Sequence, residues 1–222
     1  RHTMVQFLEH SIIYDGDCVE FGVYRGGSAK IIAEKIKNTT KNLYLLDSFC
    51  GIPKINQYDN FWKVGDFADC DLVKVKNFLS NYQNVFFIDG VFANTIQKIK
   101  DKKFCFCHID VDVYDSVLFV LDFIYDKVNS GGVILFDDYG DFVSAGAKKG
   151  VIAAQNISNK NNIFFIEPYP FKSLKDAVNQ GVPAGNVFAG RAWVTGAGIK
   201  GHSSSDGSNH WDALRSVGSK FS

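Results

Sequence analysis

The sequence predicts an α/β protein whose doubly wound, mostly parallel seven-stranded sheet is covered by helices on both faces. Short β-rich runs alternate with stretches in which apolar residues recur at helical spacing. The β-rich runs are almost continuously apolar, as expected when both faces of a sheet are covered. Acidic and glycine-rich stretches follow these runs directly, which is where ligands bind in such sheets.

The seven expected strands include two at the end of the chain with weaker signals. In chain order they are residues 18–23, 42–46, 85–88, 104–109, 132–136, 163–166 and 191–195. Three apolar stripes at helical spacing lie between the strands. They are Ala29, Ile32, Ala33 and Ile36; Leu72, Val75, Phe78 and Leu79; and Val117, Val120, Leu121, Ile124 and Val128. This alternation of strand and helix favours a parallel sheet.

The chain of 222 residues fits one domain with a substantial core. We assign residues 1–195 to that domain and expect a poorly packed or appended tail, rich in Gly and Ser, at residues 196–222. Lys plus Arg and Asp plus Glu both number 24, so the net charge is zero. This balance argues against nucleic acid or an anionic membrane as the main partner, because such binding usually needs a basic excess.

Five cysteines without a CxxC pair predict reduced, mostly buried thiols and a cytoplasmic protein. They are Cys18, Cys50, Cys70, Cys105 and Cys107. We expect Cys105 and Cys107 to share one face of a strand and to pack in the core rather than bind zinc. The first residues lack the charged-then-apolar layout of a signal peptide, and no apolar run approaches the roughly 20 residues of a membrane span.

A glycine-rich turn, EFGVYRGGS (Glu20–Ser28), follows the first strand. Gly22, Gly26 and Gly27 allow a tight turn and a close approach of a ligand to the backbone. Ser28 is expected to cap the helix that follows, whose free N–H groups can receive a carboxylate or a phosphate. The pattern is neither GxGxxG nor a P-loop, so an ordinary strand-to-helix turn remains the alternative for this segment taken alone.

Acidic residues also follow the second and third strands. Asp47 and Ser48 come after the second strand, where a carboxylate can accept hydrogen bonds from both ribose hydroxyls. Asp89 and Gly90 end the third strand, in a position to meet an adenine edge. Together with the glycine turn, these acids predict a pocket for a nucleoside-like cofactor.

Two acidic pairs follow the fourth and fifth strands. Asp110 and Asp112 lie in HIDVDVYDS, and Asp137 and Asp138 lie in FDDYG. Neighbouring strands would bring both pairs to one edge of the sheet, where four carboxylates repel one another unless a cation lies among them. Oxygen ligands of this kind suit Mg²⁺, with Mn²⁺ or Ca²⁺ as competitors.

Some of these polar residues have structural interpretations as well. A period of two places His108, Asp110 and Asp112 on the same side of the fourth strand. His108 fits the role of a buried histidine, or of one that orients a ligand, better than that of a metal ligand. Asp115 is expected to cap the helix that contains Val117.

Two rival functions are open at this point. Asp110-Val111-Asp112 is formally a DxD motif, which in metal-dependent glycosyltransferases holds a metal against a nucleotide-sugar diphosphate. The glycine turn followed by Asp47 favours a nucleoside with a carboxylate tail instead. The second rival is a non-catalytic module on the same fold, against which the complete set of acids at the strand ends argues.

Several segments resemble, in sequence and in order, those of the macrocin O-methyltransferase family, class I enzymes that use S-adenosylmethionine to methylate sugar hydroxyls. The segments are VEFGVYRGGSA (Val19–Ala29), LLDSFCGIP (Leu45–Pro53), GDF (Gly65–Phe67), DGVFANT (Asp89–Thr95), HIDVDVYDS (His108–Ser116), GGVILFDDYG (Gly131–Gly140) and GAKKGV (Gly146–Val151). The resemblance covers residues 15 to 155, and HIDVDVYDS together with FDDYG is its most specific part.

The resemblance implies roles for the matching residues. It implies Mg²⁺ ligation by Asp110, Asp137 and Asp138, with Mn²⁺ as a substitute, and it makes Asp112 the general base. Asp110 and His108 complete the candidate catalytic residues. The candidate residues for binding S-adenosyl-L-methionine are Glu20, Gly22, Tyr24, Gly26, Gly27, Ser28, Asp47, Ser48, Asp89, Gly90 and Asp110.

The acceptor implied by the resemblance is a hydroxyl of a small molecule or glycan, with neither nucleic acid nor a membrane span involved. Family members usually carry a longer N-terminal region that helps to cover the active site, whereas only a short segment precedes the first predicted strand here. We therefore expect the lid over the acceptor to be incomplete in this chain. A neighbouring subunit of a homo-oligomer would complete it.

Overall fold

The computed structural model describes residues 2–139, 144–158, 163–164 and 193–195, and the side chains of residues 4–139 and 144–153. Its centre is a sheet in which five parallel strands are ordered β3-β2-β1-β4-β5. These strands are β1 (Asp17–Phe21), β2 (Leu43–Asp47), β3 (Val85–Asp89), β4 (Phe104–Ile109) and β5 (Val128–Phe136). Two short strands, β7 (Trp193–Thr195) and β6 (Ile163–Phe164), follow β5 in antiparallel pairing. The expected tail at 196–222 lies outside the described residues.

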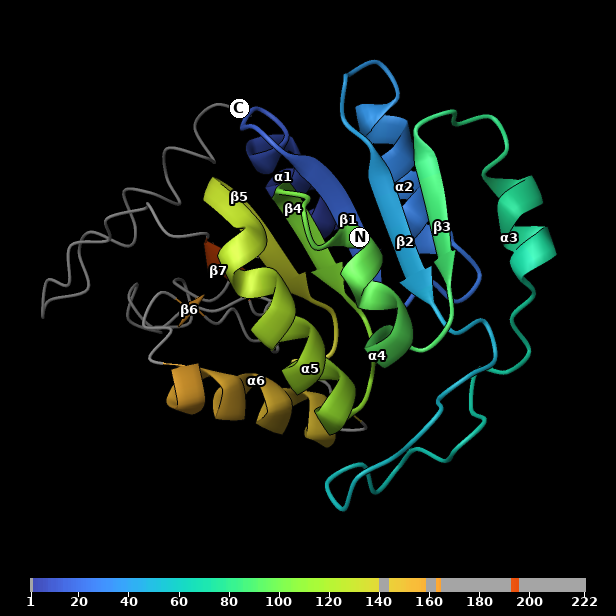
Figure 1. Cartoon of the computed structure of the whole chain (residues 1–222), viewed down its shortest axis with the longest axis vertical. Coiled ribbons are helices and arrows are strands. Elements are labelled where there is room, and N and C mark those ends of the chain that lie inside the picture. The colour runs from blue at the N-terminus through green and yellow to red at the C-terminus, as the bar shows by residue number, and fades with distance from the viewer. Residues whose placement is uncertain (1, 140–143, 159–162, 165–192, 196–222) are drawn as a thin grey trace, which may run out of the picture.

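Helices cover both faces of the parallel strands, with α4 and α5 in front of the sheet and α1 and α2 behind it in Figure 1. The helices are α1 (His2–Ser11), α2 (Gly27–Ile36), α3 (Leu72–Phe78), α4 (Phe92–Thr95), α5 (Tyr114–Ile124) and α6 (Ala145–Ser158), with the 3₁₀ turns η1 (Ile96–Ile99) and η2 (Tyr125–Lys127). One apolar core lies between the sheet and α1, α2 and α3, and a second lies between the sheet and η1, α5 and α6. This arrangement confirms the predicted α/β class with a doubly wound, mostly parallel sheet.

The chain order reverses between β1 and β4, and this reversal positions the functional site. From this point, β1, β2 and β3 follow one another toward one edge of the sheet, while β4 and β5 follow one another toward the other edge. In open α/β sheets, such a point leaves a crevice beyond the carboxyl ends of the two central strands. Both the glycine turn after β1 and the acidic segment after β4 emerge at this crevice.

The strand predictions differ most from the structure at β5. The prediction started this strand at residue 132 and assigned Val128 to the preceding helical stripe, but Val128 is the first residue of β5. Helix α5 ends at Ile124, and η2 turns the chain so that Val128 pairs with Phe104 of β4. The apolar spacing therefore continues from the helix into the strand, although the turn between them ends the helix.

The predicted stripe of α2 is fully buried, whereas that of α3 is correct only in part. Val75 and Leu79 are buried, but 45% of Phe78 is exposed. Helix α3 has seven residues and follows the outer edge of the sheet, so it covers the core with one narrow side. The ring of Phe78 instead lies beneath the Lys30 ammonium, 4.3 Å from the ring centroid.

All five cysteines are free thiols, and Cys18, Cys105 and Cys107 are fully buried. The prediction that Cys105 and Cys107 share one face is wrong. Cys105 packs in the core on the α1 and α2 side, whereas Cys107 packs in the opposite core. The pairing of β4 with its neighbours shifts register between Phe104 and Phe106, and a bulge of this kind interrupts the alternation of side chains.

Among the helices that the structure describes, none combines the length and the apolar character needed to cross a membrane.

Candidate active site

A cavity of about 440 Å³ opens beyond the carboxyl ends of β1, β2 and β4. One side is formed by the turn after β1 and the end of β2, and the other by the segment after β4 and the first turns of α5. The segment 48–71, which we call the β2–α3 loop, supplies a third wall. The volume lies within the range of about 300 to 1,000 Å³ that is usual for small-molecule sites.

Gly22 brings the glycine turn against the end of β4. Its φ is +81°, and a Cβ at this position would lie 1.7 Å from the carbonyl oxygen of Asp110. The Asp110 amide donates to the Phe21 carbonyl at 2.8 Å, while the Gly22 amide donates to Leu46 at 3.0 Å. Three strands are thus joined at a point where only glycine fits.

Asp47 lines the cavity, and its side-chain carboxylate binds the backbone amides of the glycine turn. Its Oδ2 accepts hydrogen bonds from the amides of Val23 (2.7 Å) and Tyr24 (2.9 Å), and its Oδ1 accepts one from Phe49 (2.8 Å). A carboxylate has about four acceptor positions, so three of them serve the protein itself. Asp47 therefore shapes the cavity in addition to facing it.

Tyr24 connects the glycine turn to the far end of the β2–α3 loop. Its backbone is left-handed, with φ +48°, and its hydroxyl donates to the Asp69 carboxylate at 2.9 Å. Arg25 pairs with the same carboxylate, and the Cys70 thiol donates to the Tyr24 carbonyl at 2.6 Å. Phe67 packs edge-on against the Tyr24 ring. The loop is consequently fastened at this end to the turn after β1.

Of the predicted cofactor residues, Gly22, Tyr24, Asp47, Ser48 and Asp110 line the cavity. The others do not: Glu20, Gly26, Gly27, Ser28, Asp89 and Gly90. The prediction that Ser28 caps α2 is wrong, because the cap is Gly26, whose left-handed φ of +78° turns the chain into the helix. No side chain caps that helix start.

Sequence reasoning missed several residues that line the cavity, and two groups of them are contiguous in the chain. Residues 91–93 line the cavity directly after the predicted Asp89 and Gly90, within the stretch DGVFANT. The sequence signal was therefore present but was placed two residues too early. Residues 51–54 of the β2–α3 loop also line the cavity, and no periodicity marks them.

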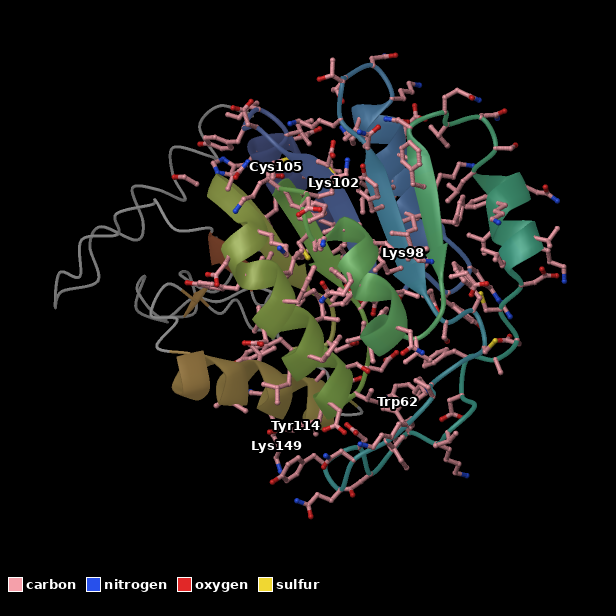
Figure 2. All side chains as sticks on the ribbon, in the orientation of Figure 1. Trp62, Lys98, Lys102, Cys105, Tyr114 and Lys149 are labelled. Atoms are coloured by element: carbon pink, nitrogen blue, oxygen red, sulfur yellow. The ribbon has the colours of Figure 1, made fainter. Side chains whose placement is uncertain are left out.

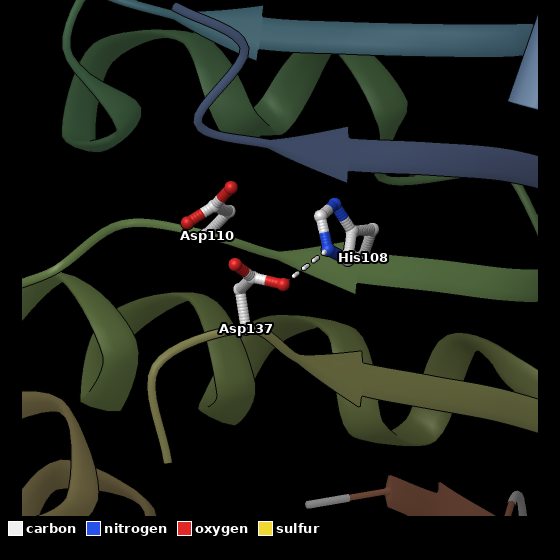
Figure 3. Close-up of side chains that lie close together, drawn as sticks. All are labelled: His108, Asp110 and Asp137. Atoms are coloured by element: carbon white, nitrogen blue, oxygen red, sulfur yellow. Dashed lines mark ion pairs between the residues drawn. The ribbon is translucent and has the colours of Figure 1, made fainter. Parts of the chain in front are cut away.

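The acidic end of the site gathers His108, Asp110 and Asp137. One ligand atom from each lies within 4.8 Å of the others, and Figure 3 shows the three side chains converging from β4 and from the end of β5. The Asp137 amide donates to the Ile109 carbonyl at 3.0 Å, which fixes the two strand ends side by side. The predicted meeting of the two acidic segments at one edge is present in the structure.

Glu20 and His108 form a buried pair behind this cluster. They are register partners on β1 and β4, and His108 Nδ1 lies 2.8 Å from Glu20 Oε1. The side chain of His108 is 1% exposed and that of Glu20 is 0% exposed, so Glu20 faces His108 rather than the cavity where a cofactor contact was predicted. His108 Nε2 points toward Asp137 Oδ1 at 3.6 Å.

The pKa shifts in this cluster follow from burial and crowding. Burial by itself lowers the pKa of His108, but the carboxylates of Asp137 and Glu20 outweigh it and raise the pKa to about 10. Burial and the negative charges of Asp138, Asp137 and Asp112 raise the pKa of Asp110 well above its usual value. Without a cation, this end of the site therefore favours protons on Asp110 and His108.

Asp112 lines the cavity beyond the end of β4, and its amide donates to Asp138 Oδ2 at 3.2 Å. The predicted alternation of His108, Asp110 and Asp112 does not reach Asp112. The strand ends at Ile109, and Asp112 has a left-handed backbone with φ +58°. Aspartate tolerates this conformation better than most residues, and such backbone strain often accompanies a site.

The start of α5 also differs from the prediction. Asp115 is the second residue of the helix rather than its cap, and its carboxylate accepts from Lys54 at 3.0 Å and from Asn56 at 2.9 Å. The free amide of Tyr114 is instead satisfied by Asp59 at 2.9 Å. Asp59 lies 55 residues earlier in the β2–α3 loop, so no local pattern could indicate it.

A doubly wound sheet with a glycine turn after its first strand and an acidic cluster after its fourth and fifth defines a Rossmann-like protein with a built small-molecule site. Residues 3–163 match the model of the macrocin-O-methyltransferase (TylF) family. The chain therefore belongs to that family.

Two curated relatives are O-methyltransferases from Streptomyces. One is the 8-demethyl-8-(2,3-dimethoxy-alpha-L-rhamnosyl)-tetracenomycin-C 4'-O-methyltransferase of Streptomyces olivaceus, 24% identical, with 62% of each chain covered. The other is the demethyldecarbamoylnovobiocin O-methyltransferase of Streptomyces niveus, 30% identical, with 56% of this chain and 53% of the relative covered. The chain thus spans less than two thirds of the length of either relative.

Solved structures show the same fold. The O-methyltransferase NovP superposes with a TM-score of 0.64 at 21% identity, covering 88% of this chain and 78% of NovP. The calicheamicin methyltransferase CalS11 gives a TM-score of 0.67 at 18% identity, covering 87% and 77% of the two chains. The family match favours the methyltransferase interpretation over the glycosyltransferase that the DxD motif suggested.

Proposed function

We propose that this chain transfers a methyl group from S-adenosylmethionine to a hydroxyl of a small, sugar-containing acceptor, assisted by a divalent cation. The observation that carries the proposal is that the Asp47-braced glycine turn and the acidic residues after β4 face one cavity. Membership of the macrocin-O-methyltransferase family supports the same chemistry. Both curated relatives are named for methylating oxygen atoms of natural products, and the name of one specifies a rhamnosyl group.

The cofactor is proposed to occupy the end of the cavity beside β1 and β2. Gly22 leaves the backbone open there, and Asp47 and Ser48 supply polar groups. Residues 91–93 add an apolar side suited to a flat adenine ring. Glu20 is proposed to act from behind the site, through His108.

The residues at the acidic end fit a divalent cation. Asp110 and Asp137 already converge within 4.8 Å, and Asp138 adds a third negative charge that acts on Asp110. A hard ion such as Mg²⁺, or Mn²⁺ in its place, would relieve this repulsion through oxygen ligands. We assign the ligand role to Asp110, Asp137 and Asp138, and we assign His108 to orienting Asp137, because its other nitrogen is already held by Glu20.

A bound cation would lower the pKa of the acceptor hydroxyl and fix its orientation. Asp112 faces the cavity and is proposed to take the hydroxyl proton. The hydroxyl oxygen forms its bond to the methyl carbon as the bond from that carbon to sulfur breaks, and S-adenosylhomocysteine leaves. The bond from the Asp112 amide to Asp138 fixes the position of the base relative to the acidic cluster.

Calorimetry with S-adenosylhomocysteine tests the cofactor assignment. We expect the wild-type chain to bind it and Asp47→Ala to weaken the affinity about tenfold, since the variant loses hydrogen bonds that hold the turn. Methyl transfer is then assayed with macrocin and with a rhamnosylated natural product as trial acceptors. A wild-type chain that does not bind S-adenosylhomocysteine would overturn the proposed function.

A cytoplasmic location is also proposed, on the ground that all five thiols are free. The expected homo-oligomer, in which a neighbouring subunit covers the acceptor, stays a prediction. Sedimentation of the purified chain checks it.

A further inference from the structure

The β2–α3 loop (residues 48–71) crosses the mouth of the cavity from the cofactor end to the start of α5. Phe67 and Cys70 line the cavity where the loop meets the glycine turn. Ile52, Pro53 and Lys54 line it where the loop approaches α5. In Figures 1 and 2 the loop runs beyond the carboxyl ends of the strands to the start of α5.

The buried side chain of Asp59 holds the end of the loop that approaches α5. It is 2% exposed, although it lies in a loop without regular structure. Its Oδ1 accepts from the Tyr114 amide at 2.9 Å, and its Oδ2 accepts from the Asn56 amide at 2.7 Å. Tyr114 is the first residue of α5, so its amide has no partner within the helix. The Asp59 carboxylate satisfies this amide from outside the helix and complements the helix dipole.

Helix α6 closes around the same carboxylate. A Cβ at Gly146 would lie 1.8 Å from Asp59 Oδ1 and 3.3 Å from the Tyr114 amide nitrogen. A hydrogen atom is therefore the only side chain that fits while Asp59 keeps its position. The loop, α5 and α6 meet at one buried oxygen.

The other contacts between loop and helices are more exposed. Lys54 pairs with Asp115 at 3.0 Å, but 76% of the Lys54 side chain is exposed. Tyr58 packs against Tyr114 with ring centroids 4.9 Å apart, and Lys149 lies over the Tyr58 ring; Figure 2 labels Tyr114 and Lys149 close together at this corner. Exposed ion pairs contribute little, whereas a buried charged hydrogen bond is worth more. Asn56 also donates to Asp115 at 2.9 Å, but the Asp59 carboxylate is the most buried of these fastenings.

We propose that Asp59 is a positioning residue that fastens the β2–α3 loop to the start of α5 and thereby sets the wall of the cavity beside Asp112. It acts through the backbone of Tyr114, two residues after Asp112, and is not among the residues that line the cavity. The proposal rests on the proposed function in one respect: Asp112 is the proposed base, so the wall beside it is taken to face the acceptor.

Hydrogen exchange measured by mass spectrometry on the full chain tests the fastening. In Asp59→Ala we expect exchange of segments 52–58 and 112–116 to accelerate on the order of tenfold, as the loss of a charged hydrogen bond requires. The amides of Val23 and Tyr24, which Asp47 holds, should keep their rates. The affinity for S-adenosylhomocysteine should change less than about twofold.

Two further variants separate positioning from general stability. Asp59→Asn keeps one oxygen for the Tyr114 amide and should restore slow exchange at 112–116, but not at Asn56. The matched control is Asp66→Ala, because Asp66 makes the same local bond inside the loop, to the Lys63 amide at 2.8 Å. It should leave 112–116 unchanged.

Gly146→Ala tests the same corner with Asp59 still present, and so covers the case in which Asp59→Ala does not fold. Its methyl group should displace the carboxylate and accelerate exchange at 112–116. Unchanged exchange there in both variants, or a uniform acceleration that includes Val23 and Tyr24, overturns the proposal. If the wild-type chain fails to bind S-adenosylhomocysteine, the proposed function fails, while these exchange rates still decide the fastening.

Discussion

The two ends of the cavity are built on different physical principles. At the cofactor end, the backbone forms the surface, and Asp47 is already satisfied by three amides of the chain. At the acidic end, side chains form the surface, and burial together with neighbouring negative charges raises the pKa of Asp110 well above its usual value. The first end is organised without a ligand, whereas the second is electrostatically strained until a cation or protons compensate it. A variant should therefore affect one end and spare the other.

The largest effect is expected from Asp110→Asn. The variant removes a proposed ligand from the acidic end, so methyl transfer should fall by about 10³-fold or more. Affinity for S-adenosylhomocysteine should stay within about twofold, because the turn braced by Asp47 is untouched. Radiometric methyl transfer and calorimetry measure the two quantities. Full activity in this variant, or in the wild-type chain with excess EDTA, would remove the metal role.

Asp112→Asn should lower kcat by about 10²-fold, the range for loss of a general base. Binding of Mn²⁺, followed by its electron paramagnetic resonance, should persist, since Asp112 is the proposed base and Asp110, Asp137 and Asp138 are the proposed ligands. A variant that loses Mn²⁺ and activity together would make Asp112 a ligand instead. The pH dependence of kcat would then decide whether Asp112 also acts as the base.

Gly22→Ala sharpens the comparison from the backbone side. The new methyl group would meet the Asp110 carbonyl, in a backbone with φ +81°, and we expect a loss of unfolding free energy on the order of 3 kcal/mol. Gly27→Ala is the matched control, because its Cβ would meet nothing within 4 Å at the start of α2. Chemical denaturation of both variants measures the difference. Equal stabilities would show that the two strand ends are not pressed together.

In the metal-free chain, a gradual effect of pH on stability is expected. Folding raises the pKa of His108 from 6.5 to about 10, so the protonated histidine stabilises the fold below pH 6.5, and this contribution is lost as the pH rises through 10. Unfolding in EDTA should therefore require less denaturant as the pH rises across that window. Glu20→Gln removes one of the raising charges and should flatten the dependence. A wild-type profile that is already flat would contradict the buried ion pair.

The parts predicted well from the sequence depend on local patterns. The bounds of β4, the buried stripe of α2 and the meeting of the two acidic segments follow from apolar runs and from polar residues at their ends. The parts predicted wrongly contain a bulge or a turn, and the periodicity of apolar residues does not reveal either feature. The bulge in β4 moved Cys105 to the other face, and the turn η2 moved Val128 from helix to strand.

By itself, the sequence determined which chemical groups stand at the carboxyl ends of the strands, because each strand and the residues after it are contiguous in the chain. Only the tertiary structure decided which of those groups meet. Glu20 reaches His108 across 88 residues because β1 and β4 are neighbours, and Asp59 reaches Tyr114 across 55 residues because the loop folds back onto α5. Such pairs are formed by packing between distant segments, so their partners cannot be found from spacing along the chain.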